Sequence, residues 1–362
     1  MVDDVPASTL TAVDLFCGCG GLSLGFRMAG FKVLLGLDLD RHAISTYKYN
    51  NPEVITINKD VRKTSSNEIM DEGEIQRSDV DILMAGIPCE GYSLLNRCYN
   101  SNDPRNYLFQ DFMRIAKKVD PRCILIENVP GLVKRANGTF KEAITQDLRD
   151  MGYRVAFTQL NAANYGVPQL RERIFFLAMR ETLPSFPPPS YAPSKQLQLL
   201  ERKELQPYTS TWDAISDLPG LSPGEVRDQY EGDPLTSYQQ MLRGDNKRLF
   251  NHEAPKHPPW TVKVLKSVRP GAPIYQTFKQ RVRLSWKAPA PTIPAGGIRP
   301  QWFFAHPEQP RGLTVRECAR LQSFPDNYVF VGPLIKQRIQ VGDSVPPFLA
   351  RALAEGIKYC LK

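Results

Sequence analysis

A strand, a glycine-rich turn, a helix and a second strand follow one another within the first 40 residues, and this order constrains the fold most strongly. Residues 12–16 have the apolar pattern of a buried strand, and a helix is predicted from the turn to residue 29. Another apolar strand follows at residues 32–37. Strand, crossover helix and strand are typical of parallel pairing. The chain is therefore predicted to adopt an α/β fold.

The turn itself indicates a nucleotide-type ligand. Gly18, Gly20 and Gly21 let the backbone approach a ligand that side chains would block. Asp38 lies 20 residues after Gly18, at the end of the second strand, where a carboxylate reaches ribose hydroxyls. The Gly-x-Gly-Gly spacing departs from the dinucleotide pattern, and no Gly-Lys-Ser/Thr follows. An adenosyl group without phosphates fits better, and the alternative is a turn that only packs a helix on a strand.

Reactive and charged residues border further predicted strands. Cys89 follows the apolar strand at residues 80–85, and Glu127 follows the next predicted strand. Arg171 and Arg173 border a fourth strand. Taken singly, these residues are explained by inert packing, a salt bridge and a solvated surface. Together they supply a nucleophile, a carboxylic acid and two guanidinium groups, a set that suits attack on a polar heterocycle.

Six segments resemble the cytosine-C5 methyltransferase family in order and spacing. They are residues 14–21 (DLFCGCGG), 86–93 (GIPCEGYS), 127–129 (ENV), 169–173 (QLRER), 316–328 (RECARLQSFPDNY) and 340–346 (QVGDSVP). The resemblance covers nearly the whole chain. It implies a Rossmann-like sheet of the S-adenosylmethionine-dependent methyltransferases with a smaller inserted target-recognition domain.

The resemblance also implies catalytic roles. Cys89 would add to C6 of cytosine, because C5 is too weakly nucleophilic to take a methyl group from a sulfonium unaided. Glu127, protonated or sharing a proton, would stabilise the charge that develops near N3 and the exocyclic amine. Arg173 would hold O2, and Arg171 would support the site and the backbone. This chemistry requires no metal.

The implied cofactor is S-adenosylmethionine, which leaves as S-adenosylhomocysteine. Phe16 would lie beside the adenine, Asp38 would bind the ribose hydroxyls, and Leu39 would cover the base. The complete implied set is Phe16, Cys17, Gly18, Gly20, Gly21, Leu22, Asp38, Leu39, Asp60, Val61, Gly86, Pro88, Leu108, Asp343, Ser344 and Val345. Without the resemblance, ordinary core packing would explain Leu39, Val61 and Leu108.

The chain departs from the family at two positions. Asp343 stands where asparagine is usual, and Glu90 replaces the usual glutamine after the nucleophile. A carboxylate at 343 facing the carboxylate of the cofactor would repel it and weaken binding. The alternative role for Asp343 is to cap backbone N–H groups before the final helix.

Positive charge is concentrated in the second half of the chain. Residues 1–180 carry 22 Lys+Arg and 22 Asp+Glu, so the net charge of +8 comes from residues 181–362. Residues 243–299 carry 12 basic and 2 acidic side chains. Aromatic residues accompany them at Trp260, Tyr275, Phe278 and Trp286. This composition is typical of a surface that binds a polyanion, and a solvated loop surface is the alternative.

The order of segments predicts a discontinuous catalytic domain. The proline-rich residues 184–193 interrupt the α/β pattern, and turn-rich segments follow. Regular pattern returns where Thr314 and Glu317 predict a capping box, and a final amphipathic helix is predicted over residues 348–361. We predict a catalytic domain at residues 1–184 and 313–362 and a target-recognition domain at residues 185–312.

Duplex DNA is the predicted partner. A base inside a duplex is out of reach of a buried thiol, so the enzyme would extrude it. By resemblance, Ser93 and Arg105 would lie along the DNA. From the basic segment, Lys279, Arg281 and Arg283 are predicted to contact phosphates. A cognate restriction endonuclease is expected as a functional rather than a physical partner, and a monomer is expected.

Composition limits the remaining classes. The sequence has no apolar run of about 18 residues and no signal peptide, so a cytoplasmic, nucleoid-associated protein without a membrane partner is expected. Seven cysteines without paired spacing argue against a disulfide framework or a zinc module.

The leading hypothesis is a stand-alone prokaryotic DNA cytosine-C5 methyltransferase with a specific target sequence. A transfer-RNA methyltransferase of the same family, a catalytically inactive DNA-binding homologue and a Rossmann oxidoreductase are the alternatives. The target sequence cannot be predicted, because base readout depends on the geometry of the inserted domain.

Overall fold

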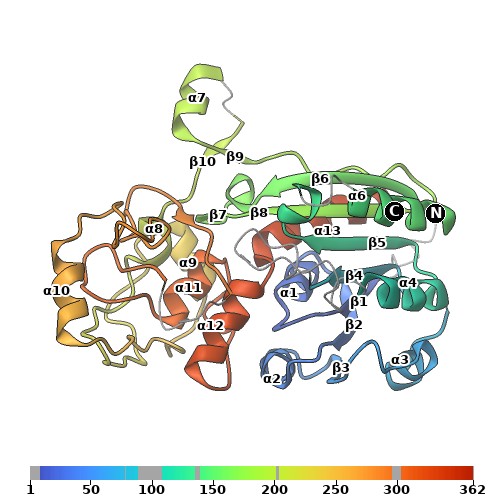
Figure 1. Ribbon diagram of the computed structural model, residues 1–362, viewed down its shortest axis with the longest axis horizontal. Helices are drawn as coiled ribbons and strands as arrows, with labels where there is room; N and C mark the ends of the chain where they lie inside the picture. The colour runs from blue at the N-terminus through green and yellow to red at the C-terminus, as the bar shows by residue number, and fades with distance from the viewer. Residues whose placement is uncertain are drawn as a thin grey trace, which may run out of the picture. The chain divides into compact units, whose positions relative to one another are not determined.

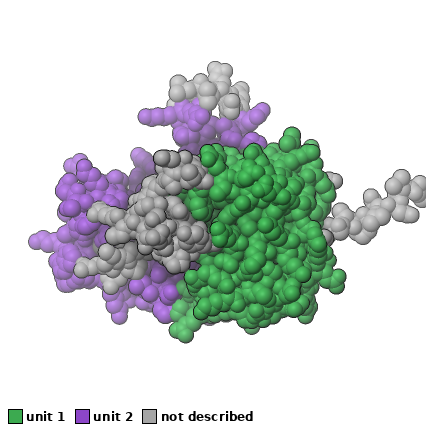
Figure 2. All heavy atoms as spheres, turned by 45° about the vertical axis from the view of Figure 1, so that its right-hand side comes forward, with its two compact units in different colours: residues 1–160, 173–187, 350–362 green, residues 161–172, 188–349 purple. Residues whose placement is uncertain are grey.

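The computed structural model describes residues 9–77, 79–88, 108–134, 139–200, 204–295 and 303–361. Two compact units divide the chain, and Figure 2 colours them separately. Unit 1 comprises residues 1–160, 173–187 and 350–362, and unit 2 comprises residues 161–172 and 188–349. No helix in these described parts is long and apolar enough to cross a lipid bilayer.

Within the described residues, unit 1 is built on a seven-stranded sheet in the order β3-β2-β1-β4-β5-β8-β6 (Figure 1). The strands are β1 (Thr11–Leu15), β2 (Lys32–Leu37), β3 (Ile55–Ile57), β4 (Ile82–Gly86), β5 (Cys123–Asn128), β6 (Arg154–Asn161) and β8 (Glu172–Met179). The pairs from β3 through β5 are parallel, and β8 is antiparallel to β5. The predicted α/β class is confirmed.

Buried strands followed the sequence pattern closely, and edge strands did not. β2 has the predicted bounds, β1 and β4 lie within two residues of theirs, and β5 and β8 lie within two residues of strands predicted at 123–126 and 173–178. The prediction missed β3 and β6, which are the two edges of the sheet. Most residues of β6 are half-buried or exposed, so its sequence carries a weaker apolar signal.

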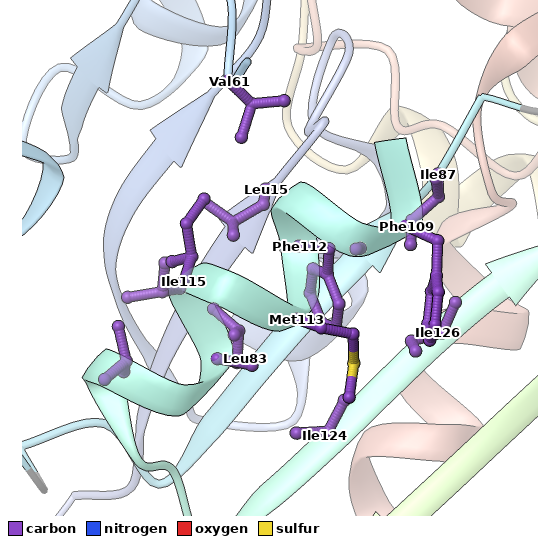
Figure 3. Packing of buried hydrophobic residues seen from close by; sticks show 14 of the residues in the cluster. Leu15, Val61, Leu83, Ile87, Phe109, Phe112, Met113, Ile115, Ile124 and Ile126 are labelled. Carbon is purple, nitrogen blue, oxygen red and sulfur yellow. The ribbon is translucent and has the colours of Figure 1, made fainter. Parts of the chain in front are cut away.

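Helix α4 (Leu108–Val119) covers one face of the sheet with a large apolar cluster (Figure 3). Phe112 and Met113 of this helix pack toward Leu83 and Ile124 of the neighbouring strands β4 and β5. Two other helices, α3 (Ser66–Glu72) and α6 (Thr139–Asp150), add apolar side chains to the same cluster. The short helix α5 (Gly131–Lys134) follows β5.

The opposite face of the sheet is covered by α1 (Gly21–Met28), α2 (Arg41–Asn50) and α13 (Pro347–Leu361). Asp14 of β1 points to this face, because side chains alternate along a strand and Val13 and Leu15 belong to the α4 cluster. On that face the hydroxyl of Ser23 in α1 donates a hydrogen bond to the side chain of Asp14. Lys358 of α13 donates to the carbonyl of Ala29, which caps α1.

The order of the strands places two loops at one position. β1 pairs with β2 on one side and β4 on the other, so the chain proceeds in opposite directions from β1 and from β4. Open parallel sheets bind ligands at the carboxyl ends of strands where the order reverses in this way. The glycine turn follows β1, and Pro88 follows β4. Both therefore emerge at the position expected for a ligand.

Unit 2 is built from short elements, as its turn-rich sequence predicts. Its helices are α7 (Ser194–Leu200), α8 (Thr211–Ile215), α9 (Ser237–Arg243), α10 (Pro259–Ser267), α11 (Val315–Leu321) and α12 (Leu334–Asp343), with the 3-10 helix η4 (Ala162–Tyr165). Its strands are the parallel pairs β7 (Gln169–Leu170) with β11 (Ala290–Pro291) and β9 (Tyr191–Ala192) with β10 (Gln206–Pro207).

Ion pairs are buried in unit 2. Arg311 binds both carboxylate oxygens of Glu317 at 2.7 and 2.9 Å, and Arg320 binds Asp326 at 2.6 and 2.9 Å. All four side chains are essentially inaccessible to solvent. Glu317 also completes the predicted capping box with Thr314 at the start of α11, which is confirmed. Glu317, Arg320 and Asp326, all within residues 316–328, therefore belong to a buried charged network.

The division into units differs from the predicted domains near residue 312. Helices α11 and α12 pack within unit 2 rather than with the sheet of unit 1. Arg320 of α11 binds Asp217, two residues after the end of α8, and Tyr238 of α9 donates to the carbonyl of Arg320. These bonds hold α11 among the elements of unit 2. The assignment of residues 185–312 to target recognition stays a prediction.

Candidate functional site

The glycine turn leaves open backbone after β1. Phe16, Gly18 and Gly20 have φ values of 60°, 54° and 94°, in the left-handed region that favours glycine. A Cβ atom placed on Gly18 would meet nothing within 4 Å. The N–H of Cys17 donates to the carbonyl of Leu37 at 3.0 Å, which ties the turn to β2. The structure therefore provides a fixed turn with space beside Gly18.

Asp38 anchors this turn with its carboxylate. Oδ2 accepts from the N–H of Gly18, and Oδ1 accepts from the N–H of Asp40, each at 2.8 Å. Burial raises the pKa of Asp38, although the two N–H donors favour its ionised form. Leu39 follows with 63% of its surface exposed. Asn58, which the sequence analysis missed, donates to the carbonyls of Asp38 and Leu39.

Beneath the turn lies a second carboxyl group that the sequence analysis did not single out. Asp14 is fully buried, and its Oδ2 accepts from the hydroxyl of Ser23 at 2.6 Å. The hydroxyl of Tyr47 donates to Ser23 at 2.8 Å. Oδ1 of Asp14 has no hydrogen-bond partner among the described residues. Burial raises the pKa of Asp14 to about 7, and the nearby Asp38 contributes in the same direction. An acidic residue in an apolar strand was the available signal.

The loop after β4 is held by a side chain from β5. Asn128 Nδ2 donates to the carbonyl of Ile87 at 3.2 Å, and its Oδ1 accepts from the N–H of Val129 at 2.8 Å. The anchored carbonyl lies two positions before Cys89. Cys89, Glu90, Ser93 and Arg105 lie outside the described residues. Asn128 thus orients the backbone that leads to the predicted nucleophile. The sequence did not indicate this positioning role.

Glu127 and Arg173 form an ion pair at the carboxyl end of β5. The Nε of Arg173 lies 3.0 Å from Oε1 of Glu127, and both side chains are mostly buried. Gly86 of β4 is the register partner of Glu127, and a Cβ atom there would lie 3.4 Å from Oε2 of Glu127. Strand pairing therefore brings a carboxyl group and a guanidinium group, 46 positions apart, to the end of the strand that leads to Cys89.

Arg171 serves a different purpose from Arg173. Its side chain is fully buried and donates to the carbonyls of Ile293 at 3.0 Å and Gly342 at 2.8 Å. Gln169 accepts from the N–H of Ile293 and donates to the carbonyl of Leu321. The arginine therefore joins separate segments of unit 2, and its support of the active site stays a prediction.

Other predicted cofactor residues differ in exposure. Val61 and Leu108 are buried in the α4 cluster, and Val61 is visible in Figure 3. The guanidinium of Arg62 binds Asp60 and lowers the pKa of that carboxyl group. Asp343, the last residue of α12, is exposed. Ser344 and Val345 follow it as buried residues of unit 2, and the approach of these three to a cofactor stays a prediction.

The three basic residues predicted to contact DNA have different environments. Lys279 is exposed, and the guanidinium of Arg281 lies over the rings of Phe278 and Phe303 at 5.7 and 5.8 Å. Arg283 is buried and donates to backbone carbonyls of Leu265, Val268, His306 and Glu308. This geometry corrects the prediction for Arg283, because its guanidinium is used inside unit 2 instead of facing a phosphate.

The described residues contain no group of three or more His, Cys, Asp or Glu side chains arranged to hold a metal ion. The polar groups at the ends of β1, β2, β4 and β5 are instead backbone amides, carboxyl groups and one guanidinium. Such a set suits an organic ligand with hydroxyl, amide and charged groups.

Comparison with known proteins gives a consistent result. Residues 10–359 match the family model of C-5 cytosine-specific DNA methylases. The type II methyltransferase M.DdeI of Desulfomicrobium norvegicum is 36% identical over 97% of this chain and 89% of its own length. M1.HphI of Haemophilus parahaemolyticus, also a type II methyltransferase, is 34% identical over 96% of this chain and 87% of its own. A prophage-encoded E. coli protein, described as a DNA modification methyltransferase, has a similar structure with a TM-score of 0.79 and 25% identity, over 97% of this chain and 99% of that one.

Proposed function

This chain belongs to the C-5 cytosine-specific DNA methylase family, and from that premise we propose that it methylates C5 of a flipped-out cytosine in a specific duplex DNA sequence. S-adenosylmethionine is the proposed methyl donor. The observation that carries the proposal is the Glu127–Arg173 pair beside the strand that leads to Cys89. It supplies acidic and cationic groups next to a nucleophile, as attack on a pyrimidine requires.

The residues around the glycine turn fit an adenosyl cofactor. Gly18 leaves room for a ligand, Asp38 is fixed at the end of β2 where ribose hydroxyls bind, and the exposed Leu39 offers an apolar surface to a base. The buried carboxyl group of Asp14, whose Oδ1 has no partner among the described residues, adds negative potential under the turn when it is ionised. When bound, S-adenosylmethionine supplies an electrophilic methyl group on a positively charged sulfur.

Cys89 activates the base in this proposal. Its thiolate adds to C6 of cytosine, which makes C5 nucleophilic enough to take the methyl group. Glu127 shares a proton with N3 and the exocyclic amine, and Arg173 holds O2 while fixing the carboxyl group of Glu127 at 3.0 Å. Loss of the C5 proton and of the thiolate then restores aromaticity. Asn128 keeps the backbone before Cys89 in place.

Unit 2 supplies the proposed DNA-reading surface. Its exposed basic residues, including Lys279, would neutralise phosphates while the target base leaves the stack. The type II names of the relatives support a role as the modifying partner of a restriction endonuclease, one that acts on the same DNA without forming a complex with this chain. A cytoplasmic protein associated with the nucleoid is consistent with this role.

Trapping with 5-fluorocytosine tests the nucleophile. Fluorine cannot leave C5 as a proton does, so the parent protein should form a stable covalent complex with duplex DNA that contains the analogue at its target. Cys89→Ser should bind this DNA and form no adduct, which denaturing electrophoresis measures. Cys360→Ser is the matched control, because Cys360 is a free, partly exposed cysteine of the final helix. Trapping by Cys89→Ser would remove Cys89 from this role.

The choice between DNA and transfer RNA is tested with tritiated S-adenosylmethionine. The proposal expects label in duplex DNA and none in transfer RNA. Label confined to transfer RNA would favour the RNA branch of the family. No label in either, together with retained DNA binding, would indicate an inactive homologue.

A further inference from the structure

We propose that the buried carboxyl group of Asp14 makes cofactor binding proton-linked, so that its ionised form favours the cationic methyl donor and its protonated form favours the neutral product. The inference rests on the proposed function, because donor and product belong to that reaction. In this role Asp14 positions the turn and responds to the charge of the ligand. The role does not require Asp14 to contact the reacting atoms.

Geometry sets Asp14 apart from an ordinary core residue. The carboxyl group is inaccessible to solvent, its Oδ2 accepts from the hydroxyl of Ser23 at 2.6 Å, and its Oδ1 has no partner among the described residues. A buried ionised carboxylate with an unpartnered oxygen is costly, because desolvation penalises the charged form. Burial raises the pKa of Asp14 to about 7, so near neutral pH a nearby charge shifts the balance between its two protonation states.

Among the described residues, no cation is one of the groups that shift the protonation of Asp14. Asp38 approaches from the end of β2 and opposes ionisation, and the Cys17 thiol of the turn is held neutral because burial raises its pKa. Tyr47 of α2 acts through Ser23. β4, the other neighbour of β1, contributes only uncharged residues (ILMAG). A positive charge brought to the turn is thus the missing stabilising partner of an ionised Asp14.

Methyl transfer removes that positive charge. The donor carries a sulfonium, whereas the product is a neutral thioether with the same amino and carboxyl groups. Asp38 binds the N–H of Gly18, so the turn, Asp38 and Asp14 form one connected electrostatic unit. In a buried site charges interact over longer distances than in water. Donor binding therefore releases a proton from Asp14, and conversion to product lets the proton return, which favours exchange of product for new donor.

Proton release is measured by titration calorimetry rather than by turnover. S-adenosylmethionine and S-adenosylhomocysteine are titrated separately into the full chain at pH 7.0, in phosphate and in Tris, whose ionisation enthalpies differ. With a pKa of about 7 for Asp14, the donor should release about half a proton more than the product does. The sulfonium lowers the pKa of the donor's amino group relative to that of the product, so the protons exchanged by the ligands' own amino groups are measured with the free ligands and subtracted. In Asp14→Asn the difference should vanish.

A second variant covers the case in which Asp14→Asn fails to fold. Ser23→Ala removes the donor that favours the ionised carboxylate, so the difference in proton release should persist and reach its maximum at higher pH. A parent protein that binds and uses the donor without any difference in proton release would overturn the inference alone. The inference would also be overturned if the difference in proton release persisted in Asp14→Asn. It would likewise be overturned if the pH of its maximum were unchanged in Ser23→Ala. Failure to bind either ligand would overturn the proposed function as well.

Discussion

At the residue scale, side chains of the same type have opposite roles according to their surroundings. The guanidinium of Arg173 lies 3.0 Å from a carboxylate, whereas Arg171 and Arg283 donate hydrogen bonds to backbone carbonyls. A guanidinium carries five donors in a fixed plane, so it joins several carbonyls at once when it is buried. Arg173 thus has an acidic partner at the proposed site, whereas Arg171 and Arg283 stabilise unit 2 through backbone carbonyls.

Gly342 shows how tightly one of these scaffold contacts is packed. Its carbonyl accepts from Arg171, and a Cβ atom at this position would overlap the carbonyl of Pro294 and lie 2.6 Å from Cα of Ala295. Backbone atoms cannot move aside as a flexible side chain does. Gly342→Ala should therefore destabilise the protein by roughly 1–3 kcal/mol, despite the better helix propensity of alanine.

Urea denaturation measures this effect for Gly342→Ala. Gly232→Ala is the matched control, because a Cβ atom at Gly232 would meet nothing within 4 Å, and its midpoint should stay close to that of the parent. Equal midpoints for Gly342→Ala and the parent would contradict this prediction. They would show that the backbone at 294–295 shifts without lowering the free energy of unfolding.

At the element scale, histidines act as acceptors that hold the loops before α11. Nδ1 of His306 accepts from the N–H groups of Glu308 and Gln309 at 3.2 and 3.0 Å. His257 Nε2 accepts from the N–H of Gly312 at 2.9 Å. An acceptor nitrogen must be unprotonated, and burial lowers the pKa of His306 to about 4. The hydrogen bonds that hold these turns therefore form only while the histidine rings are neutral.

Acid should destabilise the protein through His306. Its unfolded state takes up a proton near pH 6.5, while the folded state does so only near pH 4, so stability is present above pH 6.5 and is lost as pH falls toward 4. The contribution is at most about 1.4 kcal/mol per pH unit. His306→Asn keeps an acceptor oxygen that does not titrate. Thermal unfolding of both proteins from pH 8 to 4.5 should show a shallower decline for His306→Asn, and parallel curves would contradict this role.

At the scale of the whole molecule, charge is divided between the units. The acidic and basic residues of the first 180 positions balance, and the excess of basic residues lies beyond them. Lys279 and Arg281 belong to the part of unit 2 where basic residues are densest. A polyanion such as duplex DNA is therefore expected to bind this surface with strong dependence on salt.

Neutralising two of these residues tests the interface. Lys279→Gln combined with Arg281→Gln should lower the slope of log K against log salt by up to about 1.8, since each phosphate contact contributes about 0.9 for B-DNA. Affinity for S-adenosylmethionine should not change. Fluorescence anisotropy at several salt concentrations measures the slope.

The control for the DNA measurement removes the same charge elsewhere. Lys117→Gln with Lys118→Gln changes two exposed residues at the end of α4, in unit 1, and should leave the slope as in the parent. Equal slopes for the unit 2 double variant and the parent would show that Lys279 and Arg281 face solvent instead of phosphates.

Local pattern in the sequence was sufficient for the buried strands, the glycine turn and the capping box of α11, because each depends on residues close together in the chain. The identity of the reactive side chains was also available, since Glu127, Arg171 and Arg173 border strands that the pattern predicts. The edge strands β3 and β6 were missed because a strand buried on fewer sides carries a weaker signal.

Tertiary structure alone decided which of these residues meet. Glu127 and Arg173 pair because β8 runs antiparallel to β5, and Arg283 is excluded from the surface because four carbonyls surround its guanidinium. The network of Asp14, Ser23 and Tyr47 likewise joins a strand to two helices. Burial and long-range pairing result from the packing of distant segments, and no local pattern in the sequence encodes them.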